Sequence, residues 1–597
     1  MSSFRELLKN KDIVEHIFQY LHLEEQIKCL NVCKLWRRVI VKSLWMKKFR
    51  YLNVFKTPYV TIITNTRSDR SNTEIIDRKL EKLIEYKTAL KGDECNIFLE
   101  EVAPVVRNLR LYSEYLSYQQ KLGVSFQNVQ LFCNLRYICY KRLIVSNGQL
   151  KLLVSSCMQL QKLEFIECTC RQLSVLIPGI NLAIEHLEKL PFLRELVVQC
   201  EEDTVQPEIE CTTLHRTLSK LRLRTLILKN FKIIDNGADT VRITHGDSVM
   251  VLNVGIISLD FWPDFKHHLK DFSNLIDLTI NVLNCNTVVN SSVLELVALR
   301  CKKLQRLSLE NCDFFVEDFS VMKSLRHLSL LNCGGFTADN LQQVLGELSL
   351  ISFSLHHTRI LGTVIDIRIS ATLQELEINT IYFNEISDIL QMSVGPMENL
   401  LILKWLNGNV NDDWINDKCP NLRVLHIPNY QMIRHKILKM STLRELSFSS
   451  CKGFSWRFFL LLIRNLTLKS FSLRTFDIIE DGSDVPTHAY GIHSTLESIF
   501  IPHHIFKTAQ EFWMDLLALN RQMRIIFYGE YWDMFSPMFL RSLLRYPVME
   551  NSLKQFRICG FLVDIEDLKN AWDDTLHDLN MKISHYRSRN LKITMEL

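Results

Sequence analysis

The chain of 597 residues is 47% hydrophobic and 23% charged, so it can bury a large core and is not disordered as a whole. Gly (18) and Pro (13) are scarce, which argues against sandwich domains joined by flexible linkers. The net charge of +5 is too small to indicate nucleic-acid binding by itself. The longest dense apolar run, 458–463, is far shorter than the roughly 20 residues that a bilayer span needs.

The positive charge lies at one end of the chain. Residues 1–56 contain 12 Lys/Arg and 5 Asp/Glu, a net charge of +7, so the other 541 residues sum to −2. The 17 cysteines are scattered without a spaced framework, and many fall in apolar segments. Such cysteines indicate a reducing compartment. The first residues, MSSFRELLKNKD, lack an apolar signal core. We therefore expect a cytoplasmic and/or nuclear protein.

Residues 1–56 have the pattern of a small helical module. The stretch DIVEHIFQYL (12–21) places Ile13, Val14, Ile17, Phe18 and Leu21 at helical spacing. A second, bent helical pattern covers 24–40, and SLW (43–45) follows it. A module of this size is too small to be comfortably stable alone, so its apolar residues predict burial against the rest of the chain or a partner.

Residues 57–105 are interpreted as a loop and helical bridge. Ser71 and Glu74 fit a capping box at the start of a helix. Leu80, Leu83, Ile84 and Leu90 give that helix an apolar stripe, so 68–90 is predicted to be a polar loop followed by a helix.

From residue 106 onward the sequence repeats the pattern L-x-x-L-x-L-x-x-C/N. The five clearest copies begin at Leu160, Leu304, Leu325, Leu422 and Leu443. Weaker copies begin at Val106, Leu135, Leu193, Leu223, Val254, Leu275, Leu350, Leu373, Leu400, Leu468, Leu496, Met523 and Leu553. The 18 starts have a mean spacing of about 26 residues, which is in the range of leucine-rich repeats.

The repeat predicts one short strand and one outer helix in each unit. L-x-L alternates with period two, so one side of each strand faces inward. Residues 290–303 and 337–348 have helical patterns with polar residues at their starts. Stacked units bury what a single unit cannot. We predict an α/β fold: a leucine-rich-repeat solenoid of about 18 units over 106–597, with a curved parallel β-sheet and outer helices.

Four cysteines, Cys168, Cys312, Cys333 and Cys451, share one position in the repeat. We expect them to fill a small internal slot and to meet backbone groups of the next turn. This resembles the cysteine-containing leucine-rich repeats. Three polar insertions, 199–211, 234–248 and 477–494, are interpreted as loops, each either a tolerated surface loop or a binding segment.

The front module resembles an F-box, whose pattern runs L-P-x-E-I-L-x-x-I-F-x-Y-L, then V-C-x-x-W, then L-W. Matching pairs are Ile13-Val14, Ile17-Phe18, Tyr20-Leu21, Val32-Cys33 with Trp36, and Leu44-Trp45. Two departures stand out. Lys9-Asn10 replaces the leading Leu-Pro, and Gln26 stands where Leu is expected.

An F-box followed by such repeats resembles the F-box/leucine-rich-repeat substrate receptors. The resemblance implies docking to the Skp-family adaptor of an SCF-type cullin–RING ubiquitin ligase, with target proteins held on the repeats for ubiquitination and degradation. It also implies an all-α F-box module over 1–56. Expected adaptor-binding residues are Ile13, Val14, Ile17, Phe18, Leu21, Val32, Cys33 and Trp36.

Outward strand positions of the repeats line the inside of the solenoid, where a protein substrate would bind. Candidate substrate-binding residues are Asp277, Arg306, Glu310, His327, Lys404, His426 and Glu445. Their mixed charge excludes a uniformly acidic or basic ligand.

The sequence contains no phosphate-binding glycine loop, no G-x-S-x-G and no H-E-x-x-H, so we expect no catalytic residues, no metal and no cofactor. The chain is therefore predicted not to be an enzyme but a non-catalytic adaptor, without nucleic-acid or membrane binding. The main alternative is a leucine-rich-repeat scaffold or inhibitor in which the F-box-like segment only caps the solenoid. A small-molecule-gated receptor needs converging basic residues, which the clear repeats lack.

Overall fold

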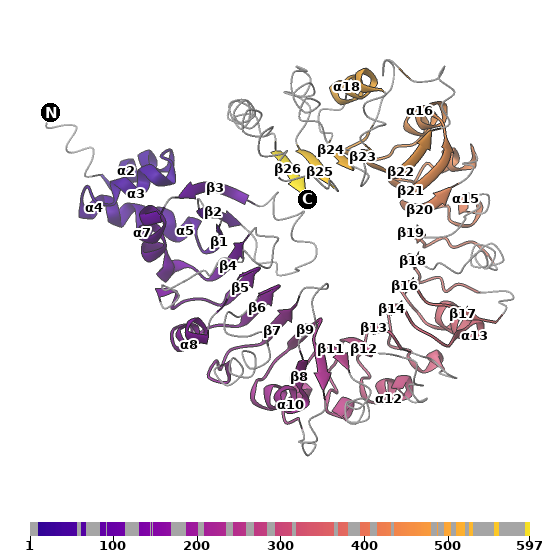
Figure 1. Cartoon of the computed structure of the whole chain (residues 1–597), viewed down its shortest axis with the longest axis horizontal. Helices are drawn as coiled ribbons and strands as arrows, with labels where there is room; N and C mark the ends of the chain where they lie inside the picture. The colour runs from indigo at the N-terminus through magenta and orange to yellow at the C-terminus, as the bar shows by residue number, and fades with distance from the viewer. Residues whose placement is uncertain are drawn as a thin grey trace. The chain divides into compact units, whose positions relative to one another are not determined.

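The computed structural model describes residues 10–56, 61–66, 84–90, 92–113, 131–143, 145, 147–168, 187–200, 208–234, 243–257, 268–282, 293–312, 318–362, 368–379, 395–405, 415–430, 435–478, 486, 495–502, 509–519, 524–528, 555–559 and 592–596. The chain divides into two compact units (Figure 1). The first contains Met1–Thr287 and Glu295–Asn311, and the second contains Val288–Leu294 and Cys312–Leu597.

The first unit begins with the helical front module. Its elements are α2 (Lys11–Gln19), α3 (Leu23–Cys29), α4 (Lys34–Arg38), the π-helix η1 (Val39–Trp45) and α5 (Met46–Lys48). Asn10 caps α2, because its side-chain oxygen accepts hydrogen bonds from the backbone N–H groups of Asp12 and Ile13. The predicted bent second helix is thus two helices and a π-helix separated by a turn at 30–33.

The predicted helix over 68–90 is wrong at its C-terminal end. Residues Ile84–Leu90 form strand β3, which pairs antiparallel with β2 (Thr61–Thr66), and β2 pairs antiparallel with β1 (Tyr51–Lys56). Residues 67–83 lie outside the described residues. The helix of this region is instead α7 (Gly92–Val102), followed by η2 (Ala103–Val105).

The repeats of the first unit form a parallel sheet that starts on the front module. Strand β1 pairs in parallel with β4, so the chain passes from the helices directly into the sheet. The successive strands are β4 (Asn108–Ser113), β5 (Tyr137–Lys141), β6 (Lys162–Ile166), β7 (Glu195–Gln199), β9 (Thr225–Lys229), β11 (Val251–Ile257), β12 (Asp277–Val282) and β13 (Arg306–Glu310).

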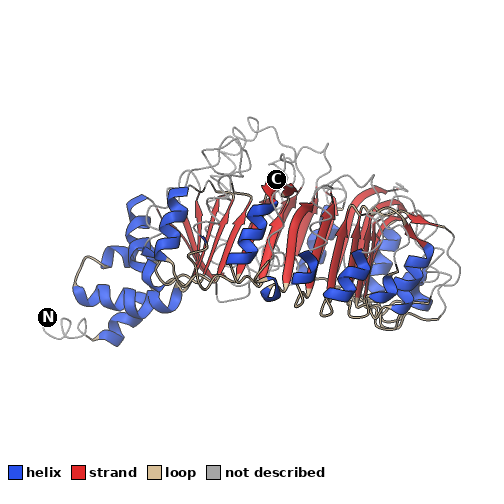
Figure 2. Cartoon of the chain, turned by 90° about the horizontal axis from the view of Figure 1, so that it is seen from below, coloured by secondary structure: helices blue, strands red, loops and turns tan. Residues whose placement is uncertain are grey.

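The second unit has a parallel sheet of its own repeats. Its strands are β14 (His327–Leu331), β16 (Ser352–His356), β18 (Glu375–Asn379), β19 (Ile402–Trp405), β20 (Val424–Tyr430), β21 (Glu445–Phe454), β22 (Ser470–Ile478), β23 (Ser498–Pro502), β24 (Arg524–Tyr528), β25 (Gln555–Cys559) and β26 (Lys592–Glu596). Figure 2 shows the strands of each unit side by side, with the front helices beside the first strands of the first unit. The parallel repeat fold that the sequence predicts is confirmed.

Helices and short turns join the strands. They are α8 (Asn147–Ser156), α10 (Cys211–Lys220), η5 (Gly246–Ser248), η6 (Leu269–Asp271), α12 (Val293–Arg300), η7 (Phe319–Val321), α13 (Ala338–Gln342), the π-helix η8 (Gln343–Glu347), α15 (Ile415–Lys418), η10 (His435–Lys439), α16 (Trp456–Asn465) and α18 (Gln510–Leu519). Within each unit they lie on one side of the strands, as α8 and α10 show in the first (Figure 1). Thr337 caps α13, as its position predicts.

Short extra strands refine the interpretation of the insertions. The end of the expected loop 199–211 forms β8 (Glu208–Glu210), which pairs in parallel with β10 (Lys232–Ile234). A separate two-stranded pairing joins β15 (Phe336–Thr337) and β17 (Ile360–Leu361). In the insertion 199–211, residues 201–207 lie outside the described residues, as does most of the insertion 477–494.

Most predicted repeat starts lie two residues before a strand, but two need correction and one strand has no predicted start. Strand β11 pairs Val251 with Asp277, so its repeat begins at Val249 rather than Val254. Strand β24 pairs Arg524 with Ser498, which moves the start at Met523 by one residue. The strand β26 was missed, because its segment lacks the leucine pattern.

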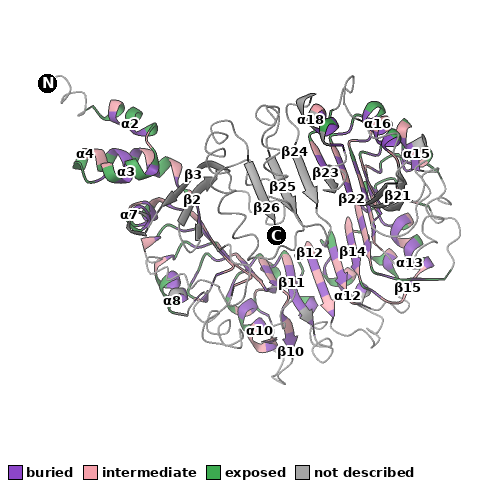
Figure 3. Ribbon diagram, turned by 45° about the horizontal axis from the view of Figure 1, so that its top comes forward, coloured by how far each residue is buried: buried purple, intermediate pink, exposed green. Residues whose placement is uncertain are grey.

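Each strand presents one side to the core. In β12 the side chains of Leu278, Ile280 and Val282 are fully buried, whereas those between them are half-buried. Figure 3 shows this alternation along the strands. Period-two alternation in the sequence is therefore what places the core between the sheet and its outer helices.

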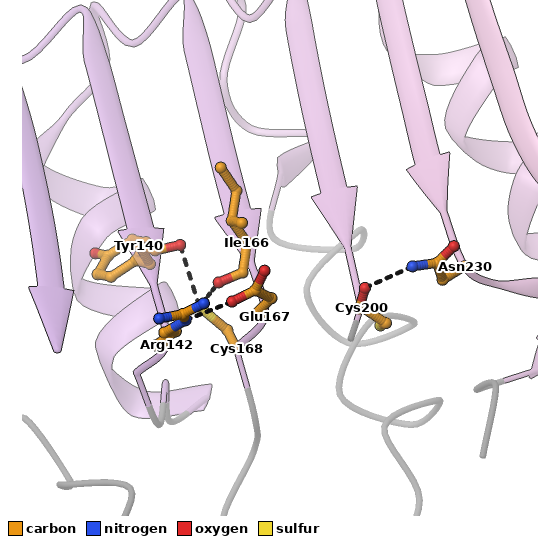
Figure 4. Close-up of polar contacts among 7 residues, drawn as sticks. All are labelled: Tyr140, Arg142, Ile166, Glu167, Cys168, Cys200 and Asn230. Carbon is orange, nitrogen blue, oxygen red and sulfur yellow. Dashed lines mark hydrogen bonds and ion pairs between the residues drawn. The ribbon is translucent and has the colours of Figure 1, made fainter. Parts of the chain in front are cut away.

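The residue after several strands adopts a left-handed backbone conformation. Its φ angle is positive at Arg142, Glu167, Asn230, Asn311, Asn332 and His357. Asparagine tolerates this conformation better than most residues, because its side chain can bond to nearby backbone groups. At Asn230 the Nδ2 atom donates to the carbonyl oxygen of Cys200 on the preceding coil, at 2.8 Å (Figure 4).

The repeated cysteine fills the slot that the sequence predicts, but toward the preceding coil. The Sγ atom of Cys168 donates to the carbonyl oxygens of Tyr140, at 3.2 Å, and Ile166, at 3.4 Å (Figure 4). Cys312 and Cys333 are buried at the same position. The side chain of Cys451 lies outside the described residues.

Candidate protein-docking surfaces

Helix α2 carries two adjacent apolar stripes that differ in exposure. Val14 and Phe18 are 1% and 2% exposed. Ile17, just before Phe18, is 44% exposed, and Tyr20, two residues after it, is 75% exposed. Since residues three and four apart share a helix face, one stripe packs into the module and the other faces outward. Figure 3 shows the exposed residues on α2 and α3.

The other predicted docking residues divide in the same way. Val32 is 60% exposed in the turn between α3 and α4, and Cys33 beside it is exposed. Ile13, Leu21 and Trp36 are half-buried. The Trp36 ring packs edge-on against Phe18, with centroids 5.1 Å apart. Val14 and Phe18 therefore support the surface from within, whereas Ile17 and Val32 can contact a partner.

Tyr20 is an exposed residue of this surface that the candidate set omits. Its signal was present in the sequence, because Tyr20-Leu21 match Y-L of the F-box pattern. Tyr20 follows the last residue of α2, and its ring packs edge-on against His16 of that helix, at 5.2 Å between centroids. The apolar docking surface, named here the front face, consists of Ile17, Tyr20 and Val32.

Gln26, the departure from the F-box pattern, forms a buried bridge. It is 3% exposed. Its Nε2 atom donates to the carbonyl oxygens of Phe18, at 2.8 Å, and Leu21, at 3.0 Å. Its Oε1 atom accepts from the indole N–H of Trp45 at 2.7 Å. A single amide thus satisfies the end of α2 and the tryptophan of η1, which a leucine could not do.

A different side of the module packs on the solenoid. The Phe98 ring of α7 lies 5.0 Å from the rings of both Trp45 and Phe49. Arg37 of α4 pairs with Glu101 of α7. The module therefore covers the first coil with one set of residues while the front face remains outward.

Basic side chains accompany the front face. Lys28 of α3, Lys34 and Arg38 of α4 and Lys42 of η1 are exposed on the same module. Lys47 pairs with Glu15 at 3.2 Å. Positive charge around an apolar patch favours a partner with an acidic rim, because complementary charge speeds association and disfavours wrong partners.

On the strands of the first unit, the predicted substrate residues are engaged with one another. The Arg306 Nε atom lies 2.7 Å from Oδ2 of Asp277 on the neighbouring strand. Glu310 accepts a hydrogen bond from Nδ2 of Asn281 at 2.8 Å. A ligand at this point would have to compete with these contacts.

The predicted residues of the second unit lie in two rows of its sheet. Lys404 and His426 face each other in register, and Lys404 Nζ lies 2.9 Å from Oε2 of Glu377. His356 Nε2 lies 3.5 Å from the other oxygen of Glu377. Burial lowers the pKa of His356, and Glu377 opposes that change. His327 and Glu445 belong to another row. The seven candidates therefore divide between the two units.

Strands β5, β6 and β7, which lie nearer the front module, carry a buried polar cluster. None of its residues is among the predicted substrate-binding residues. Glu164 is fully buried, and its Oε2 atom accepts from the hydroxyl of Tyr137 at 2.5 Å. Lys162 Nζ lies 3.0 Å from Glu164 and 3.1 Å from Glu195. Burial, with Cys139 and Glu164 nearby, raises the pKa of Tyr137, so its hydroxyl remains a donor.

No group of three or more His, Cys, Asp or Glu suited to a metal ion occurs among the described residues. In the same part of the chain, no helix is both long and apolar enough to cross a bilayer.

A family model described as F-box-like matches residues 11–51, which correspond to the front module. No curated protein matches the chain. Among solved structures, an internalin from Listeria monocytogenes is 15% identical, with 66% of this chain and 91% of that chain covered and a TM-score of 0.32. The TLR13–ssRNA13 complex is 14% identical over 84% of this chain and 76% of that chain, with a TM-score of 0.34.

A leucine-rich-repeat protein of Leptospira interrogans is 13% identical over 71% of this chain and 91% of that chain, with a TM-score of 0.28. The repeated sequence and the in-register parallel strands make this chain a leucine-rich-repeat protein. Its front module is F-box-like, so the chain has the architecture that the sequence resemblance to the F-box/leucine-rich-repeat proteins predicts.

Proposed function

We propose that the protein is the substrate-recognition subunit of an SCF-type ubiquitin ligase. In this proposal, the front face docks to the Skp-family adaptor, and the repeats hold the protein to be ubiquitinated. The observation that carries the proposal is an F-box-like module whose Ile17, Tyr20 and Val32 stay 44%, 75% and 60% exposed, while Val14, Phe18 and Trp45 are buried inside it. Apolar residues gathered on such a surface are typical of docking sites.

The proposed mechanism requires no catalytic group from this chain. A substrate held on the repeats would be brought near a ubiquitin-charged conjugating enzyme at the other end of the cullin. The gain is one of effective concentration and orientation. On this proposal the protein is a non-catalytic adaptor that works where SCF complexes work, in the cytoplasm and/or the nucleus.

The test is binding of the purified full chain to a purified Skp-family adaptor, measured by isothermal titration calorimetry. The informative variant is Ile17→Asp/Val32→Asp, which places two charges on the front face. Both side chains are exposed, so the module should stay folded. We expect at least a tenfold loss of affinity, since charges buried at the centre of an interface without partners are strongly unfavourable.

The matched control is Leu152→Asp/Met158→Asp. These residues are 38% and 45% exposed at and just after α8, away from the front face. The control should bind like the wild type. If wild type does not bind the adaptor, or if both variants bind equally well, the ligase proposal is wrong.

The alternative, a scaffold in which the front module only caps the solenoid, is favoured by one observation. Trp45 and Phe49 pack on Phe98 of α7, and β1 continues into the sheet. Capping and docking use different residues, so capping alone does not exclude docking. The same titration separates them, because a pure cap would give no adaptor binding at all.

A further inference from the structure

One edge of the first unit's sheet carries a row of arginines. The residue immediately before each strand is Arg50 for β1, Arg107 for β4, Arg136 for β5, Arg194 for β7 and Arg224 for β9. Only Gln161, before β6, interrupts the row. We name these five residues the arginine edge.

Backbone hydrogen bonds fix the members of this row on successive strands. The carbonyl oxygen of Arg50 accepts from the N–H of Arg107 at 2.9 Å, and that of Arg107 accepts from the N–H of Arg136 at 2.7 Å. The same contact links Arg136 to Gln161, at 2.7 Å, and Arg194 to Arg224, at 2.6 Å. Successive positions of the row, Gln161 included, are therefore about 4.8 Å apart along the sheet.

The arginine edge is open and uncompensated in the described part of the chain. Arg50, Arg107, Arg136 and Arg224 are exposed, and Arg194 is half-buried. None of the five forms an ion pair with a described carboxylate, and Arg194 instead donates to the carbonyl oxygens of Pro191 and Leu193. Like charges opposite each other on adjacent strands destabilise a sheet, so an anionic partner would relieve this repulsion.

Carboxylates on the turns of this edge do not neutralise it. Glu188 is already paired with Arg216 at 2.8 Å. Asp271 has a mostly buried side chain that faces His268 at 3.9 Å. Asp247 is exposed but belongs to the coil beyond Arg224. Among these three carboxylates, the exposed Asp247 therefore lies beyond the last arginine of the row, Arg224.

The edge becomes partly apolar after Arg136. Met250 occupies the position of the row after Arg224 and is 37% exposed, and Phe192, two residues before Arg194, is 46% exposed. Together with Met158, which is 45% exposed on the turn before β6, these exposed apolar side chains all lie in the part of the edge that follows Arg136. This polarity fits a ligand that is acidic along most of its length and apolar at one end.

We propose that the arginine edge binds an extended acidic polypeptide segment with apolar residues at one end. Five steps of about 4.8 Å span roughly 24 Å, which an extended peptide of about seven residues covers. Guanidinium groups suit carboxylates, because their forked donors can bond both oxygens at once. Single-stranded nucleic acid fits less well, since it uses aromatic side chains interleaved with the basic ones, and Phe192 is the only exposed aromatic on the described turns of this edge.

The test uses the full chain and two fluorescein-labelled peptides, each with about eight Glu/Asp residues and a Leu-Phe pair at either the N- or the C-terminal end. Binding is measured by fluorescence anisotropy at about 0.1 M salt, where exposed charges still interact over roughly 10 Å. The variant Arg107→Glu/Arg136→Glu/Arg224→Glu should weaken binding of the preferred peptide at least tenfold.

The matched control is Arg326→Glu/Arg423→Glu/Lys469→Glu. These residues occupy the same position, immediately before strands β14, β20 and β22 of the second unit, and the change in charge is identical. The control should change affinity less than twofold. Thermal unfolding of both variants near the wild-type midpoint shows that the fold is intact.

Other outcomes overturn the proposal. Equal loss in both variants would show attraction to overall charge rather than a site. A uridine oligonucleotide of similar length that binds more tightly than either peptide would identify the edge as a nucleic-acid surface. No binding of either peptide would remove the site. The outcome is independent of adaptor binding, because the substitutions leave the front face unchanged.

Discussion

In the front module the buried polar contacts gather on single side chains, whereas in the repeat coils the same contact recurs from strand to strand. Gln26 alone serves Phe18, Leu21 and Trp45. In the coils, the carbonyl oxygen before each strand accepts the same pair of backbone N–H groups from the next coil, as at Arg136 and Arg224.

This difference teaches where single substitutions should matter. A module without repeats has no second copy of a lost contact, so removing one side chain disturbs all the groups that meet there. A coil shares its backbone contacts with two neighbours, and its stability is a sum of many similar interface terms. We therefore expect substitutions to destabilise the front module most, the interior of the coils less and the surface of the coils least.

The largest effect should come from Gln26→Ala. It leaves the buried indole N–H of Trp45 without its acceptor and removes one donor from each of the carbonyl oxygens of Phe18 and Leu21. We expect about 3 kcal/mol of destabilisation from these lost hydrogen bonds. Hydrogen–deuterium exchange should accelerate in α2 and α3. Peptides from β12 and β13 serve as the internal control and should be unchanged.

Gln26→Leu sharpens this test, because leucine is the residue that the F-box pattern expects. It fills the space but not the hydrogen bonds, so it should still destabilise the module by about 2 kcal/mol. Adding Trp45→Phe removes the orphaned N–H, and the double variant should lose less than the two single variants together. Full additivity would contradict the bridge.

A smaller effect is expected from Glu164→Ala in the first unit. The hydroxyl of Tyr137 loses its acceptor, but Lys162 keeps Glu195 at 3.1 Å. Because one partner remains, we expect about 2 kcal/mol rather than the 3–5 kcal/mol typical of a broken buried pair. Exchange should accelerate in β5 and β6 only. Glu164→Gln, which still accepts from Tyr137, should lose about half as much.

The fold could be predicted from the sequence wherever period two and the leucine pattern coincide. At Leu304 and Leu325 the strands begin two residues later, as expected. The pattern failed at β11, where both Val249 and Val254 fit it. There Gly255 has a positive φ of 81°, and the pairing shifts register between Asn253 and Ile256, so a bulge rather than a new repeat follows.

The predicted bridge helix failed for a related reason. Residues 84–90 contain Ile84, Tyr86 and Thr88 at alternate positions, which suits a strand as well as the helical spacing suits a helix. Pairing with β2 decides between them, and that partner is distant in sequence. Local propensity cannot rank two such alternatives when a tertiary contact selects one.

The front face could be predicted only in part. The F-box pattern identifies α2, but its two apolar stripes are equally hydrophobic, so the sequence does not tell which one faces outward. Contact with Trp36 buries Phe18 and leaves Ile17 exposed. The arginine edge was missed, although its signal is visible as L-R or V-R before the strands at Arg107, Arg136, Arg194 and Arg224.

A modest effect should follow Asn230→Ala. The residue has a φ of 63°, and its Nδ2 atom bonds to the carbonyl oxygen of Cys200. Alanine loses that bond and tolerates the left-handed backbone less well, so we expect about 1.5 kcal/mol of destabilisation. Local exchange at β7 and β9 measures it. Asn230→Gly, which accepts the backbone but not the bond, should lose less, and equal losses would exclude backbone strain.

The smallest effect should come from Arg306→Ala. Its guanidinium lies 2.7 Å from Asp277, but the Arg306 side chain is 51% exposed, so water competes with the ion pair. Exposed pairs contribute about 0–1 kcal/mol, and the coil retains its backbone ladder, so thermal unfolding should be nearly unchanged. A loss as large as that of Glu164→Ala would show that the strand surface, like the front module, depends on single side chains. An unchanged free energy of unfolding would mean that Arg306 and Asp277 can give up their ion pair and bind a ligand with little loss of stability.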